Sequence, residues 1–267
     1  MKRELILIKF GGSTITDVNK PNTPKLNNIR RLISEIKRAG RNKLIIVGHG
    51  GGSFPHVPAH KYKVHLGLIH SKSRYGTSLT QLSARQLNHI VMEEMLKAGV
   101  DAFSFSPSSS VVANAKKITR WDLKPIEVAL TCGFTPVVYG DVSLDLKQGV
   151  SIVSSEEVFR YLALKLKPDR IIIGTDVDGV FDADPKQVKN AKLIGRIDRS
   201  NIDKVLFGPG TKRKYNVTGS MESKVRLLYS MSKDGAATCQ IVNANVPGRI
   251  HDAIAGKKVV STIITAK

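Results

Sequence analysis

Glycine-rich segments follow two short apolar runs near the start of the chain. Lys9-Phe10-Gly11-Gly12-Ser13 closes the first run, and Gly48-His49-Gly50-Gly51-Gly52-Ser53 closes the second. Glycine lets backbone N–H groups reach phosphate oxygens because no Cβ stands in the way. Either segment alone is equally explained by a tight turn between packed elements. Neither has the P-loop or the dinucleotide-binding spacing, so the pair predicts an anion site of another kind.

Two later segments have a similar character. Thr218 to Lys224 contains a glycine turn that enters a helix, and helix N-termini favour anions. Thr175-Asp176-Val177-Asp178-Gly179 follows an Ile-rich run and opens a stretch with four aspartates that extends to Lys192. Without a ligand, the segment from Thr218 to Lys224 is explained as a capped helix start, and the segment from Thr175 as an acidic surface turn. The sequence alone does not decide between these explanations and an anion site.

The elements that must position these segments alternate between apolar strands and amphipathic helices, as in a parallel sheet covered on both faces. We expect a hairpin over 142–153 on the sheet edge and an irregular loop over 175–192. Ligands of such sheets bind at the carboxyl ends of the strands, where the glycine segments lie. The predicted strands are 5–10, 43–47, 102–105, 135–139, 170–174, 238–242 and 259–264, and the predicted helices are 26–39, 79–98, 156–166, 221–233, one between Asp122 and Gly133, and a short one after Pro247.

The composition limits the classes of partner. The chain has 267 residues and a net charge of +20, from 42 Lys and Arg against 22 Asp and Glu. Nucleic acid and phosphorylated small molecules both fit this charge, and so does a merely solvated surface. Aromatic residues are only 6%, which supplies few stacking platforms, so we do not expect a nucleic-acid partner. No apolar run approaches the roughly 18 residues of a spanning helix, and we therefore expect no membrane segment and a cytoplasmic location.

The cysteines and most histidines carry no predicted chemistry. Cys132 and Cys239 are far apart in the chain, and we expect both to be buried. The remaining histidines lack the closely spaced Cys, Asp or Glu partners of a zinc site, so no metal ligand is assigned. These histidines are His60, His65, His70, His89 and His251.

The order and content of the four segments resemble the amino acid kinase superfamily, whose members lack a P-loop and transfer the γ-phosphoryl group of ATP. The stretch from Gly48 to His56 is similar to the glycine-rich stretch ending in histidine of the isopentenyl phosphate kinases. Tyr139-Gly140-Asp141-Val142 and the segment from Gly174 to Val180 also look like that family's segments. The resemblance runs nearly end to end. It implies an α/β fold, an open αβα sandwich with a mainly parallel central sheet.

The resemblance also implies an activity: phosphorylation of isopentenyl phosphate, a prenyl monophosphate, to isopentenyl diphosphate in isoprenoid biosynthesis, with ATP and Mg²⁺ as cofactors. The single domain, 1–267, would comprise a phosphate-acceptor lobe over 1–166 and a nucleotide-binding lobe over 167–267, and the chain would form a homodimer. The implied catalytic residues are Lys9, His56 and Lys224. The implied acceptor-binding residues are Gly50, Gly51, His56 and Ser155, and the implied ATP-binding residues are Lys9, Gly11, Gly12, Ser13, Thr175, Asp176, Asp178, Gly179 and Lys224.

Several positions depart from the family pattern. Pro55 and Ser220 replace glycines, Val18 replaces a frequent lysine near Lys20, and Ser154-Ser155-Glu156-Glu157 replaces Ser-Gly-Asp-Asp. These departures motivate an alternative acceptor, another phosphate or a phosphonate, as in the fosfomycin kinases of the same group. A basic nucleic-acid-binding protein without turnover is the other alternative. The presence of both Lys9 and Lys224 argues against it.

Overall fold

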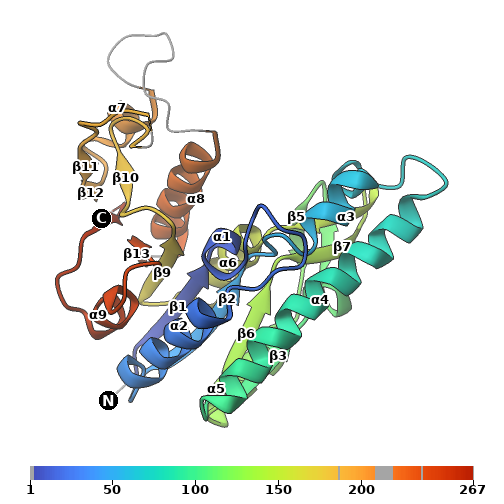
Figure 1. The fold of residues 1–267 in the computed structure, drawn as a ribbon, viewed down its shortest axis with the longest axis horizontal. Helices are drawn as coiled ribbons and strands as arrows, with labels where there is room; N and C mark the ends of the chain where they lie inside the picture. The colour runs from blue at the N-terminus through green and yellow to red at the C-terminus, as the bar shows by residue number, and fades with distance from the viewer. Residues whose placement is uncertain (1–2, 186, 208–218, 236, 267) are drawn as a thin grey trace.

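A computed structural model describes residues 3–185, 187–207, 219–235 and 237–266. Its centre is an eight-stranded sheet with the strand order β12-β14-β13-β9-β1-β2-β6-β3 (Figure 1). All neighbouring strands in it run parallel except β13 and β14. The strands are β1 Leu5–Phe10, β2 Leu44–His49, β3 Ala102–Phe105, β6 Thr135–Tyr139, β9 Arg170–Thr175, β12 Arg196–Ile197, β13 Thr238–Asn243 and β14 Ser261–Ile264. The predicted strands and the mainly parallel sheet are confirmed.

Apolar side chains leave both faces of the sheet, which is why its central strands read as continuous apolar runs. In β1, Leu7 faces one core cluster, and Ile6 and Ile8 face the other. The cluster around Leu7 is covered by α5 Lys124–Thr131, α6 Ser155–Leu166, α7 Ile202–Phe207 and α8 Gly219–Gly235. The opposite cluster is covered by α2 Leu26–Ala39, α4 Ser73–Lys97 and α9 Arg249–Ala255. This is the predicted αβα sandwich.

The predicted helices are present, and the largest difference is at the start of α4. The apolar periodicity places this start at Leu79, whereas the helix begins at Ser73. The Ser73 hydroxyl oxygen accepts hydrogen bonds from the backbone N–H groups of Ile69 and His70. These hydrogen bonds tie the preceding turn to the start of the helix, where the apolar repeat has not yet begun. None of the helices in the described ranges combines the length and the hydropathy needed to cross a bilayer.

The predicted hairpin lies in a second sheet. β7 Asp141–Asp145 and β8 Gly149–Val153 pair as expected, but they belong to a four-stranded sheet of order β5-β4-β7-β8, with β4 Val112–Asn114 and β5 Lys117–Arg120. The placement on the edge of the main sheet was therefore wrong. β4 and β5 have three and four residues, too few for a clear alternation of apolar and polar positions.

Two other expectations need correction. The loop over 175–192 is not irregular throughout, because β10 Val180–Phe181 pairs antiparallel with β11 Leu193–Ile194. Cys132 is exposed, since it follows the last turn of α5 and lies outside the packed face of that helix, whereas Cys239 is buried in β13.

Short helices complete the connections. They are α1 Gly12–Ile15, α3 His56–Lys61 and the 3₁₀ turns η1 Val64–Leu66 and η2 Pro107–Ser109. The main sheet takes strands from both sides of residue 167, so one continuous sheet joins the two predicted lobes. Figure 1 shows α7 and α8 at one end of the molecule and α3 with the start of α4 at the other.

Candidate active site

The two glycine segments meet at the carboxyl ends of β1 and β2. The Gly11 N–H donates to the Gly174 carbonyl oxygen, and the Gly50 N–H donates to the Phe10 carbonyl oxygen, each at 2.9 Å. A Cβ on Gly12 would lie 2.5 Å from the Gly52 Cα atom, so only glycine permits this approach. Gly52 has a φ of +52°, in the left-handed region that favours glycine. The tight turns thus bring the backbones of both glycine segments together at the strand ends.

A cavity of about 320 Å³ opens between these segments, β8 and the start of α6. Nine residues of the predicted site line it: Lys9, Gly11, Gly12, Ser13, Gly50, Gly51, His56, Ser155 and Lys224. They come from segments more than 200 residues apart in sequence, from Lys9 to Lys224. The hairpin strand β8 contributes Ile152 and Val153 to the wall, so the hairpin does border the site.

The electrostatic centre of the cavity is a carboxylate between two lysines. The Lys9 ammonium lies 2.7 Å from the Glu156 carboxylate, and the Lys9 side chain is only 3% exposed. Burial would raise the pKa of Glu156, but the charges and hydrogen bonds of its surroundings, chiefly Lys9, outweigh burial and hold that pKa at about 2. Burial and the nearby Lys9 charge lower the pKa of Lys224, and the charges of Glu156 and Asp176 oppose this. Two lysine ammonium groups beside one carboxylate give the cavity a net positive charge, which favours the binding of a polyanion.

His56 is the first residue of α3 and is exposed toward the mouth of the cavity. The surrounding loops nevertheless desolvate its ring, which lowers the pKa of His56, and the Glu156 carboxylate opposes that change. Within the described residues nothing hydrogen-bonds this ring. Pro55 precedes it with a φ of −75° and starts the helix, so the residue that departs from the family pattern fixes where His56 emerges.

His49, in the second glycine segment, is a core residue. Its ring is buried and stacks on Tyr139, with 5.4 Å between centroids and 7° between planes. Burial lowers the pKa of His49, and its ring nitrogens lie 3.1 Å from the Gly50 carbonyl oxygen and 3.3 Å from the Asn88 side-chain oxygen. His49 is thus buried in the core, whereas His56, seven residues later, is exposed at the cavity.

Ser155 was predicted to bind the acceptor, and it is buried with its hydroxyl donating to Glu156 at 3.2 Å. Val18, in place of the frequent lysine, also lines the cavity, whereas Lys20 does not. The side chain of Val18 contributes no charge, so among the described residues that line the cavity the lysines are Lys9 and Lys224. Thr218, which opens the predicted glycine turn before Lys224, lies outside the described residues.

The segment from Thr175 to Gly179 does not line this cavity. The Asp178 carboxylate accepts hydrogen bonds from the side chains of Asn243 and Arg249. The Thr175 hydroxyl donates to the Val177 carbonyl oxygen at 2.9 Å, and a Cβ on Gly179 would overlap the Thr262 hydroxyl. Within this segment, Asp176 interacts with the site through its charge, which acts on the ammonium group of Lys224.

Two carboxylates at the cavity were missed as site residues. Glu156 stood out only as a departure from the family pattern, and its pairing with Lys9 bridges 147 residues. Asp141 lines the cavity and is buried, which raises its pKa, although Ser106, Ser108 and its neighbour Val142 donate hydrogen bonds to it. The Tyr139-Gly140-Asp141-Val142 segment was the available signal for Asp141.

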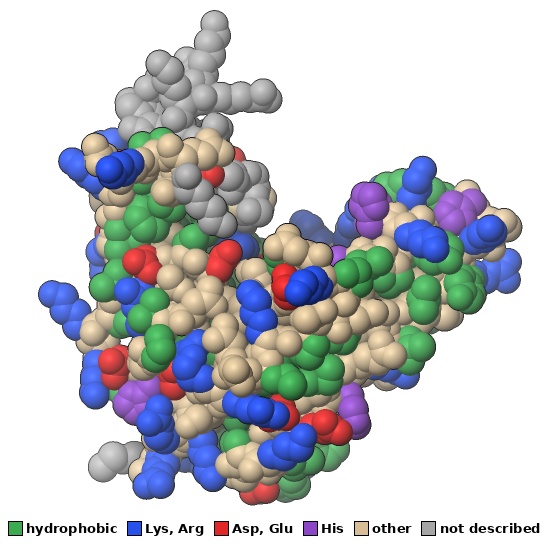
Figure 2. Space-filling view, viewed as in Figure 1, with side chains coloured by type: hydrophobic (Ala, Val, Ile, Leu, Met, Phe, Trp, Pro, Cys, Tyr) green, Lys and Arg blue, Asp and Glu red, His purple; other side chains and the backbone are tan. Residues whose placement is uncertain are grey.

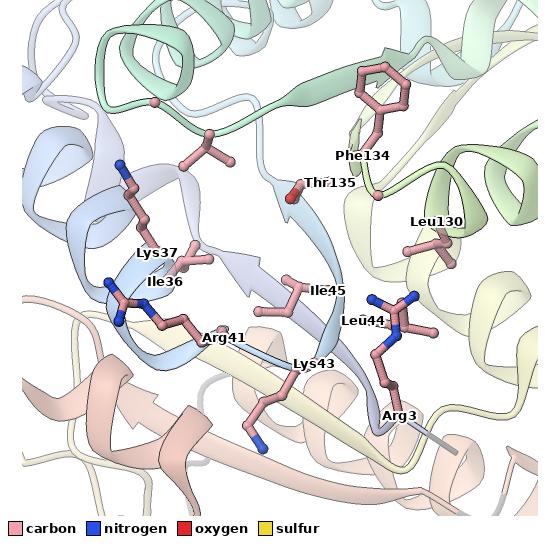
Figure 3. A pocket seen from close by; sticks show the side chains of 14 residues that line it. Arg3, Ile36, Lys37, Arg41, Lys43, Leu44, Ile45, Leu130, Phe134 and Thr135 are labelled. Carbon is pink, nitrogen blue, oxygen red and sulfur yellow. The ribbon is translucent and has the colours of Figure 1, made fainter. Parts of the chain in front are cut away.

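A second cavity, of about 200 Å³, lies at the amino ends of the main-sheet strands, where β2 and β6 begin (Figure 3). Its cations are Arg3, Lys37, Arg41 and Lys43. The Lys37 ammonium donates to the Ala98 carbonyl oxygen, and Lys43 pairs with Glu4. None of the predicted site residues lines this cavity, and it lies away from the strand ends where sheets of this kind bind ligands.

Comparison with known proteins identifies relatives along the whole chain. The model of the amino acid kinase family matches residues 4–243. The isopentenyl phosphate kinase of Methanothermobacter thermautotrophicus is 37% identical, over 98% of this chain and 100% of its own length. That of Methanocaldococcus jannaschii is 35% identical, over 95% of this chain and 96% of its own length.

Solved structures agree with these relatives. An X-ray structure of isopentenyl phosphate kinase matches with a TM-score of 0.84 and 33% identity, covering 98% of this chain and 100% of its own. A substrate complex of isopentenyl phosphate kinase matches with a TM-score of 0.79 and 28% identity, covering 98% and 99%. The fold, the site and these relatives lead to one conclusion: the chain belongs to the amino acid kinase family.

Proposed function

We propose that this protein transfers the γ-phosphoryl group of ATP to isopentenyl phosphate, forming isopentenyl diphosphate and ADP. The observation that carries the proposal is the cavity that brings Lys9, Lys224 and His56 together between two glycine segments. The full-length relatives named isopentenyl phosphate kinase support this choice of acceptor.

The chemistry requires charge neutralisation more than proton abstraction. A phosphate monoester has a second pKa near 6, by analogy with phosphoserine, so its attacking oxygen is mostly deprotonated at neutral pH. That oxygen forms a bond to the γ-phosphorus of ATP while the bond between this phosphorus and the bridging oxygen to the β-phosphate breaks, and ADP leaves. The barrier to overcome is the repulsion between two anions, which lysines and backbone N–H groups offset.

Each side chain then has a distinct task. Lys9 and Lys224 neutralise the transferring phosphoryl group, and Glu156 holds Lys9 in position. His56, with the backbone N–H groups near Gly50 and Gly51, binds the acceptor phosphate. A dianion beside its ring favours the protonated imidazole, which then donates a hydrogen bond to the phosphate. A general base is not required.

ATP and Mg²⁺ fit the residues that are present. The close contact of Gly12 with Gly52 leaves backbone rather than side chains facing the cavity, as phosphates require. The described residues contain no group of three or more His, Cys, Asp or Glu side chains placed to hold a metal. Mg²⁺ commonly binds through substrate phosphates and water, so it would enter with ATP and supply charge neutralisation there. We place the acceptor in the lobe 1–166 and the nucleotide in the lobe 167–267.

We also propose a homodimer that forms through the open edge of the main sheet at β3. Phe103 and Phe134 are exposed at this edge, and Phe105 is partly buried beside them. The Phe103 ring centroid lies 5.1 Å from that of Phe105 and 5.7 Å from that of Phe134. Exposed edges with large apolar side chains favour association. Light scattering coupled to size exclusion should give twice the chain mass, and Phe103→Ser should shift it toward the monomer.

A coupled ADP-release assay tests the activity. Isopentenyl phosphate, dimethylallyl phosphate and fosfomycin are compared with Mg-ATP for the wild type, Lys224→Met and His56→Ala. His89→Ala is the matched control because this exposed histidine lies on α4, outside the cavity. We expect turnover of the prenyl phosphates, a loss of about 10²–10³-fold in Lys224→Met and His56→Ala, and no loss in the control.

Other outcomes separate the alternatives. Turnover of fosfomycin but not of the prenyl phosphates would move the acceptor to a phosphonate. Binding to RNA or DNA that falls steeply with salt, without any ADP release, would favour a nucleic-acid-binding protein and contradict the kinase.

A further inference from the structure

The outer end of the acceptor lobe combines positive charge with exposed hydrophobic side chains. Residues 36–92 contain no Asp or Glu. We define the lobe tip as residues 61–75, 115–117 and 145–149. Its exposed cations are Lys61, Lys63, Lys72, Arg74, Lys116, Lys117 and Lys147. Figure 2 shows this end, at the right, with hydrophobic, basic and histidine side chains side by side and no acidic side chain among them.

The only carboxylate within the tip is internally satisfied. Asp145 is buried and accepts hydrogen bonds from the backbone N–H groups of Ala115, Lys116, Lys147 and Gln148. Burial would raise the pKa of Asp145, but these hydrogen bonds lower it to about 2. The buried carboxylate thus joins the turn at 115–116 to the turn at 147–148, and it is not exposed beside the cations on the surface.

Large apolar side chains project from the same tip. Leu146 is 74% exposed and Tyr75 is 62% exposed, and Leu66, Leu68 and Ile69 are about half exposed. Their exposure does not result from a poorly packed core. Beneath them, Val64, Val142 and Val150 form a small buried cluster that fixes the tip.

The tip is one surface, although it comes from three chain segments. The Leu68 N–H donates to the Gln148 carbonyl oxygen at 3.0 Å, which joins the segment before α4 to the β7–β8 turn. The rings of Tyr62 and Tyr75 meet edge to face at 5.5 Å. The hydrophobic and basic side chains are therefore held together rather than scattered.

We propose that this lobe tip binds the surface of an anionic lipid bilayer. Exposed aliphatic side chains among lysines are the composition of interfacial membrane-binding segments, in which the apolar groups enter the headgroup region and the cations meet anionic lipids. A second copy of the chain would bring like charges together at this surface. A nucleic acid would leave the aliphatic side chains without a partner. An anionic bilayer satisfies both features.

Vesicle flotation tests the proposal with the full chain. Vesicles of phosphatidylcholine alone and of phosphatidylcholine with phosphatidylglycerol are compared at low and high salt. We expect binding to the anionic vesicles that weakens with salt. Lys147→Glu should lower the partition coefficient by at least about fivefold, and the double variant Leu146→Ser with Ile69→Ser by at least about tenfold.

Matched controls lie elsewhere on the surface. Leu96→Ser changes an exposed leucine near the other end of α4, and Arg38→Glu reverses an exposed charge on α2; both should bind like the wild type. Circular dichroism checks that every variant is folded. The proposal is overturned by an absence of binding to anionic vesicles, or by equal effects of tip and control variants. It is also overturned if the serine variants bind normally while RNA competes fully, because the surface would then bind polyanions by charge alone.

Discussion

Replacing Glu156 by glutamine removes the carboxylate that, among the described residues, is ion-paired with the buried Lys9, while keeping the shape and one hydrogen-bond acceptor. A carboxyl whose pKa falls from 4.5 to about 2 on folding stabilises the folded state by about 3 kcal/mol at neutral pH. The Glu156 side chain is 30% exposed, and solvent screening reduces this figure to about 2 kcal/mol. Breaking a buried pair also leaves an unpaired ammonium, which acts in the same direction.

The assay is urea unfolding of the wild type and Glu156→Gln as a function of pH. Because the folded-state pKa is lowered, the stabilisation is present above about pH 4.5 and is lost as the pH falls toward 2. The difference in unfolding free energy should therefore be about 2 kcal/mol at pH 7 and should narrow below about pH 5.

Glu222→Gln is the matched control. Glu222 pairs with Arg226 one helical turn away, and both side chains are well exposed, so its loss should cost at most about 0.5 kcal/mol at any pH. Equal losses in the two variants would refute the reasoning. A difference at Glu156 that stays constant into acid would refute it as well, because the lost energy would then not come from the ionised carboxylate.

Three further predictions follow from single residues. Gly52→Ala should cost about 3 kcal/mol in urea unfolding, since a Cβ at this positive φ overlaps the Thr16 side chain, whereas Gly133→Ala, at a positive φ with nothing within 4 Å, should cost about 1 kcal/mol; equal costs would contradict the close contact. Burial raises the pKa of Cys239 to about 12, so Ellman's reagent should titrate one thiol, Cys132, in the native protein and two in urea; Cys132→Ser should leave none in the native state. The imidazole of His56 should titrate below pH 6.5 in an NMR experiment on the free protein, because burial lowers its pKa, and inorganic phosphate should move the midpoint upward; an unmoved midpoint would contradict a phosphate contact.

Local signals in the sequence predicted most of the fold. Central strands such as β9 are apolar on both faces, and their length and position follow from that run alone. The elements that escaped prediction lack such a signal. The first turns of α4 lack the apolar repeat, and the Ser73 hydroxyl ties them to the preceding turn. β4 and β5 are held by Asp145 and by the Glu157 carboxylate, which accepts from the Ile118 N–H. These contacts join residues across the fold, and no local periodicity encodes them.

The candidate site likewise contains residues that the sequence predicts and one that it does not. The glycine segments follow directly from β1 and β2, so adjacent parallel strands bring them together, and their meeting could be expected from the topology. Glu156 could not be found by spacing, since it reaches Lys9 only because α6 begins where the hairpin returns to the end of β1. A carboxylate in the first turn of a helix is already explained by its favourable interaction with the helix dipole. The sequence therefore gives no reason to expect a second partner such as Lys9. In sequences with this order of elements, an acidic residue that opens the helix after such a hairpin should therefore be tested as a partner of the lysine in the first strand.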